Sequence, residues 1–291
     1  MPSRNPARPR RSALFMPASN PKALAKARTL PADVIILDLE DAVAPAEKDS
    51  ARAAACSALY AGGFGEREVV VRINGLDTEW GAADIAALAR AGADAILVPK
   101  VSGPQDVLRY HEALVAAPQE LELWTMIETT GAVLRLEAMA SLARSTRLAC
   151  WVLGLNDLSK EMRARLTPGR EVFVPFMAQA VAAARMAGIS VLDAVCNDFR
   201  NPEAIAAEAA QGAMFGFDGK SLIHPDQIAP TNAAFSPSAE EVAEAEAIVE
   251  GFALPENAGK GVIRVNGKMA ELLHLDQARR LLRLARTIAA R

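Results

Sequence analysis

The segment VIILDLED, residues 34–41, carries the pattern that decides the fold: a short apolar run that stops at a group of acidic side chains. The same pattern of an apolar run with a polar ending recurs in LFMPAS (14–19), VVVRIN (69–74), AILVPK (95–100), WTMIETTG (124–131), WVLGLND (151–157), VLDAVCND (191–198) and AMFGFDGK (213–220). Nearly continuous apolar runs are typical of parallel strands that are buried on both faces. The sequence therefore predicts eight parallel strands.

Helical segments rich in alanine, leucine and arginine separate these runs, with apolar residues at three- and four-residue spacing. Strands that alternate with helices indicate a parallel sheet, and a count of eight favours a closed (β/α)8 TIM barrel over an open doubly wound sheet. No GxGxxG or GxxxxGK[ST] motif follows any run, which weakens a nucleotide-binding open sheet. In a TIM barrel the active site lies at the carboxyl ends of the strands.

The chain divides by pattern into three predicted parts: a flexible basic tail over 1–10, a barrel over 11–235 and a C-terminal helical extension over 236–291. Within the extension we predict helices in 236–254 and 267–290, with a glycine-rich loop or short hairpin between them. A bare barrel does not need this extension. We expect it to cap the barrel mouth or to pack on a neighbouring subunit.

Composition excludes several classes of protein. The 291 residues carry a net charge of -3, so no global basic field attracts nucleic acid, and no apolar run approaches the ~20 residues that cross a bilayer. The basic N-terminal residues lack the apolar segment of a secretory signal. Three widely spaced cysteines in apolar surroundings are typical of reduced thiols, so we expect a cytoplasmic protein.

Glu128 and Asp157 end successive predicted strands, whose backbones lie about 4.8 Å apart in a sheet. Both carboxylates can therefore reach one cation at the barrel mouth. An all-oxygen site without histidine or cysteine suits Mg²⁺ or Mn²⁺. The alternative is a pair of helix caps or surface carboxylates.

Neighbouring strand ends add charge. Arg72 closes the third run, where a guanidinium can bind a substrate carboxylate through two hydrogen bonds or pair with a nearby acid. Glu40 and Asp41 follow Asp38, and so much negative charge requires a cation or an arginine; we predict that both support the metal or Arg72. Lys100 adds a less specific cation.

The residues alone do not decide the function of one further charged segment. The insert 159–173 contains Lys160, Arg163, Arg165 and Arg170, and fits either a solvated loop or an anion-binding patch. We interpret His224 as a structural residue.

Eight motifs occur in an order that resembles the HpcH/HpaI aldolase and citrate lyase family, in its citrate lyase β-subunit-like branch. They are RSALFMPASNPKALAKA (11–27), DVIILDLEDAVAPAEKDSAR (33–52), VVVRIN (69–74), AILVPK (95–100), MIETTGAV (126–133), GLNDL (154–158), GFDGKSLIHPDQI (216–228) and FSPSAEEVAEA (235–245). Each motif alone is weak, but the ordered set covers nearly the whole chain.

The resemblance implies a trimeric or hexameric TIM barrel that binds Mg²⁺ through Glu128 and Asp157. It implies that Arg72 contacts the substrate and that Arg11 also belongs to the site. It also implies a C-terminal lid over a neighbouring barrel, in which Glu271 stands in place of the family's catalytic aspartate and is one methylene longer.

The implied reaction is Claisen-type cleavage of a 3-hydroxyacyl-CoA thioester of the malyl, citramalyl or citryl type, which gives an acyl-CoA and a 2-oxo acid. Two alternatives stay open: a malyl-CoA thioesterase and a metal-dependent aldolase that acts on free hydroxy-oxo acids. A non-catalytic binding role is disfavoured because Glu128, Asp157 and Arg72 are all present.

Overall fold

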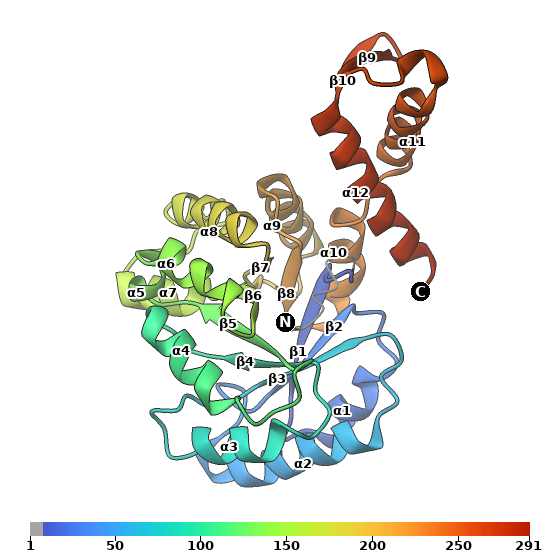
Figure 1. Ribbon diagram of the computed structural model, residues 1–291. Helices are drawn as coiled ribbons and strands as arrows, with labels where there is room; N and C mark the ends of the chain where they lie inside the picture. The colour runs from blue at the N-terminus through green and yellow to red at the C-terminus, as the bar shows by residue number, and fades with distance from the viewer. Residues whose placement is uncertain (1–7) are drawn as a thin grey trace. The chain divides into compact units, whose positions relative to one another are not determined.

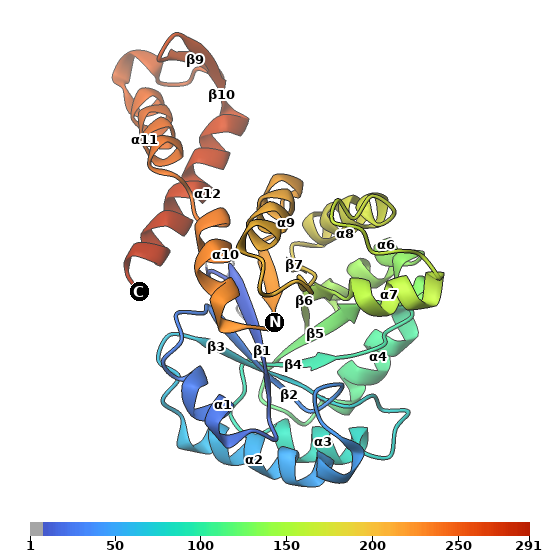
Figure 2. The same ribbon diagram turned by 180° about the vertical axis from the view of Figure 1, so that it is seen from behind.

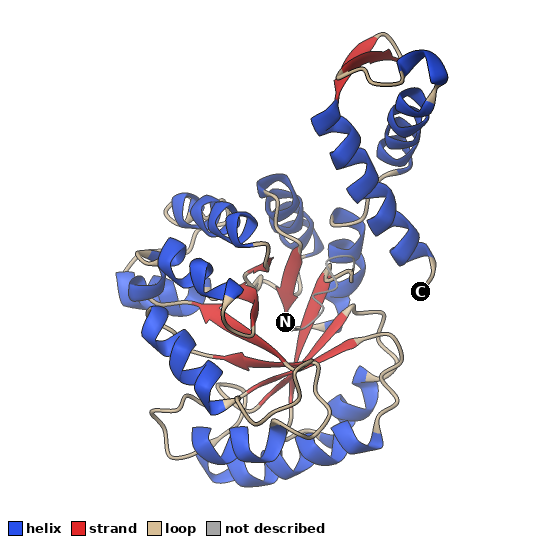
Figure 3. Cartoon of the chain, viewed as in Figure 1, coloured by secondary structure: helices blue, strands red, loops and turns tan. Residues whose placement is uncertain are grey.

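The computed structural model describes residues 8–291, which fall into two compact units that meet in sequence between Phe235 and Ser236. The first unit is a closed barrel of parallel strands, ringed by helices (Figures 1 and 3). Its strands, in chain and spatial order, are β1 (Ser12–Pro17), β2 (Val34–Asp38), β3 (Glu68–Arg72), β4 (Ala95–Val98), β5 (Glu122–Ile127), β6 (Leu148–Leu153), β7 (Ser190–Asp193) and β8 (Gly219–Leu222). The predicted TIM barrel is confirmed.

Helices connect the strands on the outside of the barrel. They are α1 (Pro21–Ala27), α2 (Lys48–Ala61), α3 (Gly81–Leu88), α4 (Pro104–Ala113), α5 (Thr130–Val133), α6 (Leu136–Ser141), α7 (Leu155–Met162), α8 (Val174–Ala187), α9 (Pro202–Phe215) and α10 (Ile228–Ala234), with short 3₁₀ turns at Pro45–Glu47, Leu142–Arg144 and Pro225–Gln227. Several begin at an Asn or Thr cap or with a proline in the first turn, as at Asn20 and Asn201.

Alternate residues of the strands face the barrel interior and the surrounding helices, and in all strands but β8 both sets are mainly apolar. Val34, Ile36 and Trp124 belong to the inner cluster, whereas Ile35 and Leu37 pack in the outer one. This double burial explains why the strands appear in the sequence as unbroken apolar runs.

The eighth strand corrects one prediction. The apolar residues 213–215 lie at the end of α9, which stops at Gly216 with φ of 89°. The strand itself is Gly219–Leu222, with the sequence GKSL, and it is buried throughout. A search for apolar runs places this strand too early because Lys220 and Ser221 are polar side chains buried by ion pairing and hydrogen bonding.

The amino end of the barrel contains a buried ion cluster. Arg10 donates to Glu68 Oε1 and Oε2 at 2.6 and 2.7 Å and to Glu122 Oε2 at 2.8 Å, and its guanidinium lies 4.6 Å from the Trp124 ring centre. Of the tail predicted over residues 1–10, residues 1–7 lie outside the described part. Arg10, however, belongs to the barrel.

The second unit is a helical hairpin capped by two short strands. Helices α11 (Ala239–Ala253) and α12 (Leu272–Ala289) lie side by side (Figure 2), joined by a 3₁₀ turn at Pro255–Asn257 and the antiparallel strands β9 (Val262–Val265) and β10 (Lys268–Glu271). The last helix starts five residues later than predicted, because Asn266 and Gly267 adopt positive φ and form the hairpin turn.

Among residues 8–291, none of the helices combines the length and the apolar character that a membrane span requires.

Candidate active site

The carboxyl ends of β2, β3, β5 and β6 bring five of the predicted residues together: Arg72, Glu40, Asp41, Glu128 and Asp157. Asp38 and Arg72 are the last residues of β2 and β3 and are paired in register. Glu128 follows β5 directly, and Asp157 lies in the first turn of α7, after β6.

Arg72 is held by acids on both sides. Its Nε and Nη2 donate to Asp38 Oδ1 and Oδ2 at 2.7 and 2.6 Å, and its guanidinium lies 4.8 Å from the centre of the Phe15 ring. Burial by itself lowers the pKa of Arg72, but Asp38 and Glu40 outweigh it and raise that pKa. The guanidinium is therefore permanently charged and fixed in direction. Of the two uses predicted for Arg72, the structure shows the pairing with acids.

Glu40 is the second acid against this guanidinium. Its Oε2 lies 2.8 Å from Arg72 Nη1, but without hydrogen-bond geometry, so this buried oxygen has no hydrogen-bond donor among the described residues. Burial raises the pKa of Glu40 to about 7, although Arg72 and Lys100 both lower it. Asp41 is exposed and lies 3.8 Å from Arg72. Both acids are thus neighbours of Arg72, and a supporting role toward the metal remains a prediction.

Glu128 is, like Asp38, an almost completely buried carboxylate of the site. Its Oε1 accepts the backbone N–H of Lys100 at 2.8 Å, while its Oε2 is buried with no hydrogen-bond partner in residues 8–291. Burial raises the pKa of Glu128, and the Lys100 charge opposes that shift. A buried carboxylate oxygen without a donor is a costly arrangement that a cation would relieve.

Gly154 allows α7 to begin close to Glu128. A Cβ atom at position 154 would lie 2.6 Å from both Cβ and Oε2 of Glu128. Glycine at the start of the segment GLND therefore permits β6 to deliver Asp157 next to Glu128.

Lys100 is the residue whose importance was underestimated from sequence. Its Nζ lies 2.7 Å from Asp157 Oδ1 and 3.6 Å from Glu128 Oε1. It also lies 3.5 Å from Glu40 and 3.7 Å from Asp41. Its one sequence signal is its place directly after an apolar run, in AILVPK.

The donor set fits Mg²⁺. Within residues 8–291, no group of three or more His, Cys, Asp or Glu side chains is arranged so that it could hold a metal ion by itself. Glu128 and Asp157 would thus provide two carboxylates, and water and substrate oxygens would complete an octahedral shell. Among the ion pairs of residues 8–291, the five carboxylates of Asp38, Glu40, Asp41, Glu128 and Asp157 contact only two cationic groups, Arg72 and Lys100, which favours an added divalent cation.

Arg11 lies at the other end of the barrel. It precedes β1, and its Nε and Nη2 donate to Asp33, the residue before β2, at 2.8 and 2.9 Å. The structure therefore does not bring Arg11 to the carboxyl ends where Glu128 lies. Its motif marks a buried ion pair at the amino end, and we do not assign it to substrate binding.

Glu271 belongs to the second unit. It is the last residue of β10 and the N-cap of α12, and its backbone N–H donates to His274 Nδ1 at 2.9 Å. The spacing of these two residues thus reflects a helix cap. The predicted catalytic use of the Glu271 carboxylate remains a prediction.

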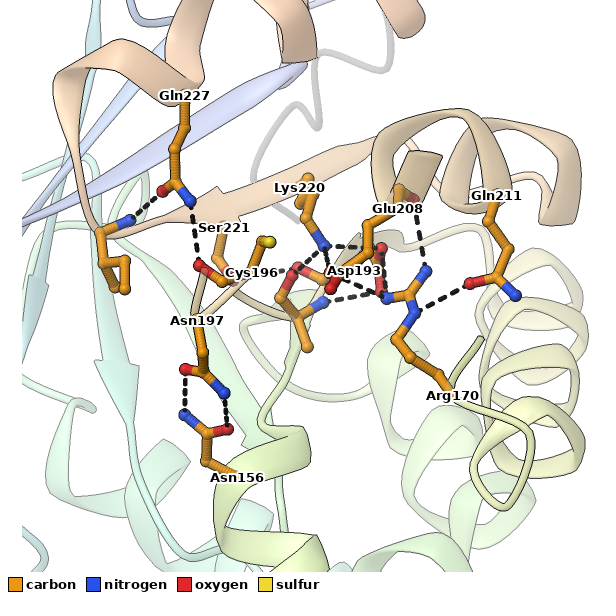
Figure 4. A network of polar contacts seen from close by, with 12 residues as sticks. Asn156, Arg170, Asp193, Cys196, Asn197, Glu208, Gln211, Lys220, Ser221 and Gln227 are labelled. Atoms are coloured by element: carbon orange, nitrogen blue, oxygen red, sulfur yellow. Dashed lines mark hydrogen bonds and ion pairs between the residues drawn. The ribbon is translucent and has the colours of Figure 1, made fainter. Parts of the chain in front are cut away.

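A buried polar network supports the neighbouring strand ends β7 and β8 (Figure 4). Lys220 Nζ donates to Glu208 at 2.8 Å and to Asp193 at 3.1 Å, and Arg170 Nη1 donates to Asp193 Oδ1 at 2.7 Å. Arg170 comes from the insert after β6 and is 2% exposed. It is therefore neither solvated nor available to a ligand anion.

The same view shows a reciprocal amide pair at the barrel mouth. Asn156 and Asn197 each donate Nδ2 to the other's Oδ1, at 3.0 and 2.7 Å. Asn156 precedes Asp157, so the pair ties the start of α7 to the loop after β7. Sequence reasoning missed this pair, because neither amide carries a distinctive motif.

Comparisons with known proteins give consistent matches over most of the chain. A profile of HpcH/HpaI aldolase/citrate lyase matches residues 11–225. The chain is 45% identical to a (3S)-malyl-CoA thioesterase of Cereibacter sphaeroides strain KD131, over 98% of this chain and 97% of the relative. It is 36% identical to the citrate lyase subunit beta of Escherichia coli K12, over 94% and 93% of the two chains.

Solved structures give the same result. The protein CitE from Mycobacterium tuberculosis, in complex with magnesium, acetoacetate and coenzyme A, superposes with a TM-score of 0.77 at 30% identity. The match covers 96% of this chain and 99% of that one.

Proposed function

The chain belongs to the HpcH/HpaI aldolase/citrate lyase family, and from this premise we propose that it is a Mg²⁺-dependent carbon–carbon lyase. Its proposed substrate is a 3-hydroxyacyl-CoA thioester of the malyl, citramalyl or citryl type. The products are an acyl-CoA and a 2-oxo acid.

One observation carries the proposal: Glu128 has a buried oxygen without a hydrogen-bond donor in residues 8–291, and Lys100 contacts both Glu128 and Asp157 at the barrel mouth. Glu128 and Asp157 would hold Mg²⁺, which supplies Lewis-acid and template chemistry for the substrate oxygens. The magnesium complex of the related CitE protein supports this choice of metal.

Arg72 binds the 2-oxo acid portion in this proposal. The Arg72 guanidinium has five N–H donors, and Asp38 accepts two of them, one from Nε and one from Nη2. Glu40 lies against Nη1. The remaining donors can bind a substrate carboxylate and the oxygen that becomes the carbonyl of the 2-oxo acid. Because Arg72 is fixed and desolvated, these bonds require little reorganisation during the reaction.

The bond changes are those of a retro-Claisen cleavage. The substrate hydroxyl releases its proton to solvent water, its oxygen becomes a carbonyl, and the carbon–carbon bond breaks. The electron pair of that bond stays with the fragment that carries the thioester, which becomes an enolate. The enolate then takes up a proton to give the acyl-CoA. We propose Glu271 of a neighbouring subunit as the proton donor.

Hydrolysis of the thioester is the second candidate. The relative with 45% identity is a (3S)-malyl-CoA thioesterase, and Glu271 is longer than the aspartate implied by the family resemblance. A longer carboxylate in the lid could activate water in place of protonating the enolate.

We further propose that the protein acts in the cytoplasm as a homotrimer or hexamer. The lid role of residues 236–291 requires at least one neighbouring barrel. Light scattering on the purified protein gives the oligomeric state directly.

The test is product analysis with malyl-CoA, citramalyl-CoA and citryl-CoA. A lyase releases 2-oxo acid without free thiol, whereas a thioesterase releases free thiol without 2-oxo acid. If no thioester is turned over, the proposed substrate class is wrong and free hydroxy-oxo acids become the substrates to assay.

A further inference from the structure

Lys100 places a positive charge at the centre of the acidic cluster. Its Nζ lies within 4 Å of four carboxylates, of which Asp157 at 2.7 Å is the nearest, followed by Glu40 at 3.5 Å and Glu128 at 3.6 Å. A surface lysine usually has one carboxylate partner or none. The four carboxylates follow β2 and β5 or lie in α7. The fold therefore specifies the position of the Lys100 ammonium.

The backbone of Lys100 is also fixed. Its φ of 53° lies in the left-handed region, which is strained for a residue with a side chain. Its N–H donates to Glu128 Oε1, and the next residue, Val101, accepts the Thr129 hydroxyl at 2.8 Å. These bonds tie the strained turn to the segment that carries Glu128. The lysine therefore cannot move away from the cluster without a change in its side-chain rotamer.

The side chain, in contrast, reaches solvent. It is 40% exposed, while the Glu128 side chain beneath it is 1% exposed. The ammonium therefore has a route into solvent, and the buried carboxylate does not. A cation that enters from the mouth meets the ammonium before it reaches Glu128.

The ammonium and a divalent cation need the same space. Mg²⁺ binds carboxylate oxygens at about 2.0–2.1 Å. An ion held by both Asp157 and Glu128 would lie beside an Nζ that contacts the same two carboxylates, and two cations at that separation repel strongly. Both cannot occupy the gap between Glu128 and Asp157.

We propose that Lys100 is an internal counter-cation that competes with the divalent metal, so that Nζ must leave Asp157 before the metal binds. This inference rests on the proposed metal site at Glu128 and Asp157. Without metal, Lys100 keeps the carboxylates together. With metal, the ammonium is displaced toward solvent, and the apparent metal affinity is lower than the carboxylates alone would give.

The experiment measures Mn²⁺ binding to full-length, chelator-treated protein by electron paramagnetic resonance of the free ion, with Mg²⁺ as competitor. Lys100→Met removes the charge and keeps an unbranched side chain, and Lys100→Gln is a second neutral variant. Lys100→Arg retains the charge. Lys160→Met, on the exposed end of α7, is the surface control.

We expect the neutral variants to bind Mn²⁺ about tenfold more tightly than wild type. This factor corresponds to a metal-free wild type in which Lys100 Nζ contacts Asp157 about ten times as often as it is displaced toward solvent. Lys100→Arg and Lys160→Met should stay near wild type. The melting temperature should fall in the neutral variants in chelator, and saturating Mg²⁺ should remove most of that difference. Equal or weaker binding by both neutral variants overturns the competition.

Failure of the inference differs from failure of the proposed metal site. If wild type binds Mn²⁺ and Asp157→Ala does not, the site stands, and an unchanged affinity in Lys100→Met overturns the inference alone. If neither wild type nor the neutral variants bind Mn²⁺, both the site and the inference are overturned.

Discussion

Asp38 and Arg72 form an ion pair with two hydrogen bonds, of 2.7 and 2.6 Å, between the last residues of adjacent strands β2 and β3. The pair is buried, and it fixes the guanidinium at the barrel mouth between Phe15 and Glu40. The pairing of β2 with β3 thus fixes the position of Arg72, the substrate-binding cation of the proposed site.

Asp38→Ala should destabilise the protein strongly, because it leaves the buried Arg72 charge with Glu40 as its nearest partner. We expect a loss of about 3 kcal/mol in the free energy of unfolding, the lower end of the range for a broken buried pair. Urea unfolding at neutral pH measures it. Asp49→Ala removes an acid that is 85% exposed and should change stability by less than about 0.5 kcal/mol. Equal effects of the two variants would refute the structural role of Asp38.

Gly154→Ala should weaken metal binding without removing any proposed ligand. The new Cβ would lie 2.6 Å from Glu128 Oε2, so the Glu128 side chain must shift. We expect about a tenfold loss of Mn²⁺ affinity, which is about 1.4 kcal/mol. Gly261→Ala is the matched control, because nothing lies within 4 Å of its added Cβ. An unchanged affinity in Gly154→Ala would show that Glu128 tolerates displacement.

Arg11→Gln separates stability from substrate binding. Because Arg11 pairs with Asp33 at the amino end of the barrel, we expect about 1–3 kcal/mol of destabilisation and an unchanged KM. Denaturation and steady-state kinetics on the same preparation give both values. An increase in KM with full stability would return Arg11 to the substrate site.

Glu40 should give the metal-free protein a pH-dependent stability. Burial raises its pKa from 4.5 to about 7 in the native state, so the native protein binds more protons than the unfolded chain between these values. The Glu40 contribution to stability therefore falls as pH rises from 4.5 to 7. Relative to Glu40→Gln, wild type should lose about 1–3 kcal/mol across this interval, given about 1.4 kcal/mol per pKa unit. A difference that is constant or grows with pH would contradict this sign.

The sequence predicts the barrel because seven of its strands are apolar on both faces. It places β8 wrongly because Lys220 and Ser221 are polar, and their burial depends on Asp193, which is distant in sequence. The start of α12 is predicted too early, since helical propensity extends through a segment that the turn at Asn266 makes a strand.

In the candidate site too, local sequence patterns predict some residues, whereas others depend on contacts that are distant in sequence. The positions of Arg72, Glu128 and Asp157 could be predicted because each lies at the end of an apolar run or within two residues of it. The position of Lys100 depends on a positive φ and on four separate acids, which no local pattern reveals. The family resemblance places Arg11 at the substrate, whereas the structure pairs it with Asp33, which lies before the next strand.

The most direct test of the central claim is a Mg²⁺ titration of 2-oxo acid release from malyl-CoA by chelator-treated wild type, Glu128→Gln and Asp157→Asn. The account predicts saturable Mg²⁺ activation of wild type and a loss of at least about 100-fold in both variants, with their fold retained by circular dichroism. Metal-independent release, or full activity in either variant, would contradict the proposal that Glu128 and Asp157 hold the catalytic cation.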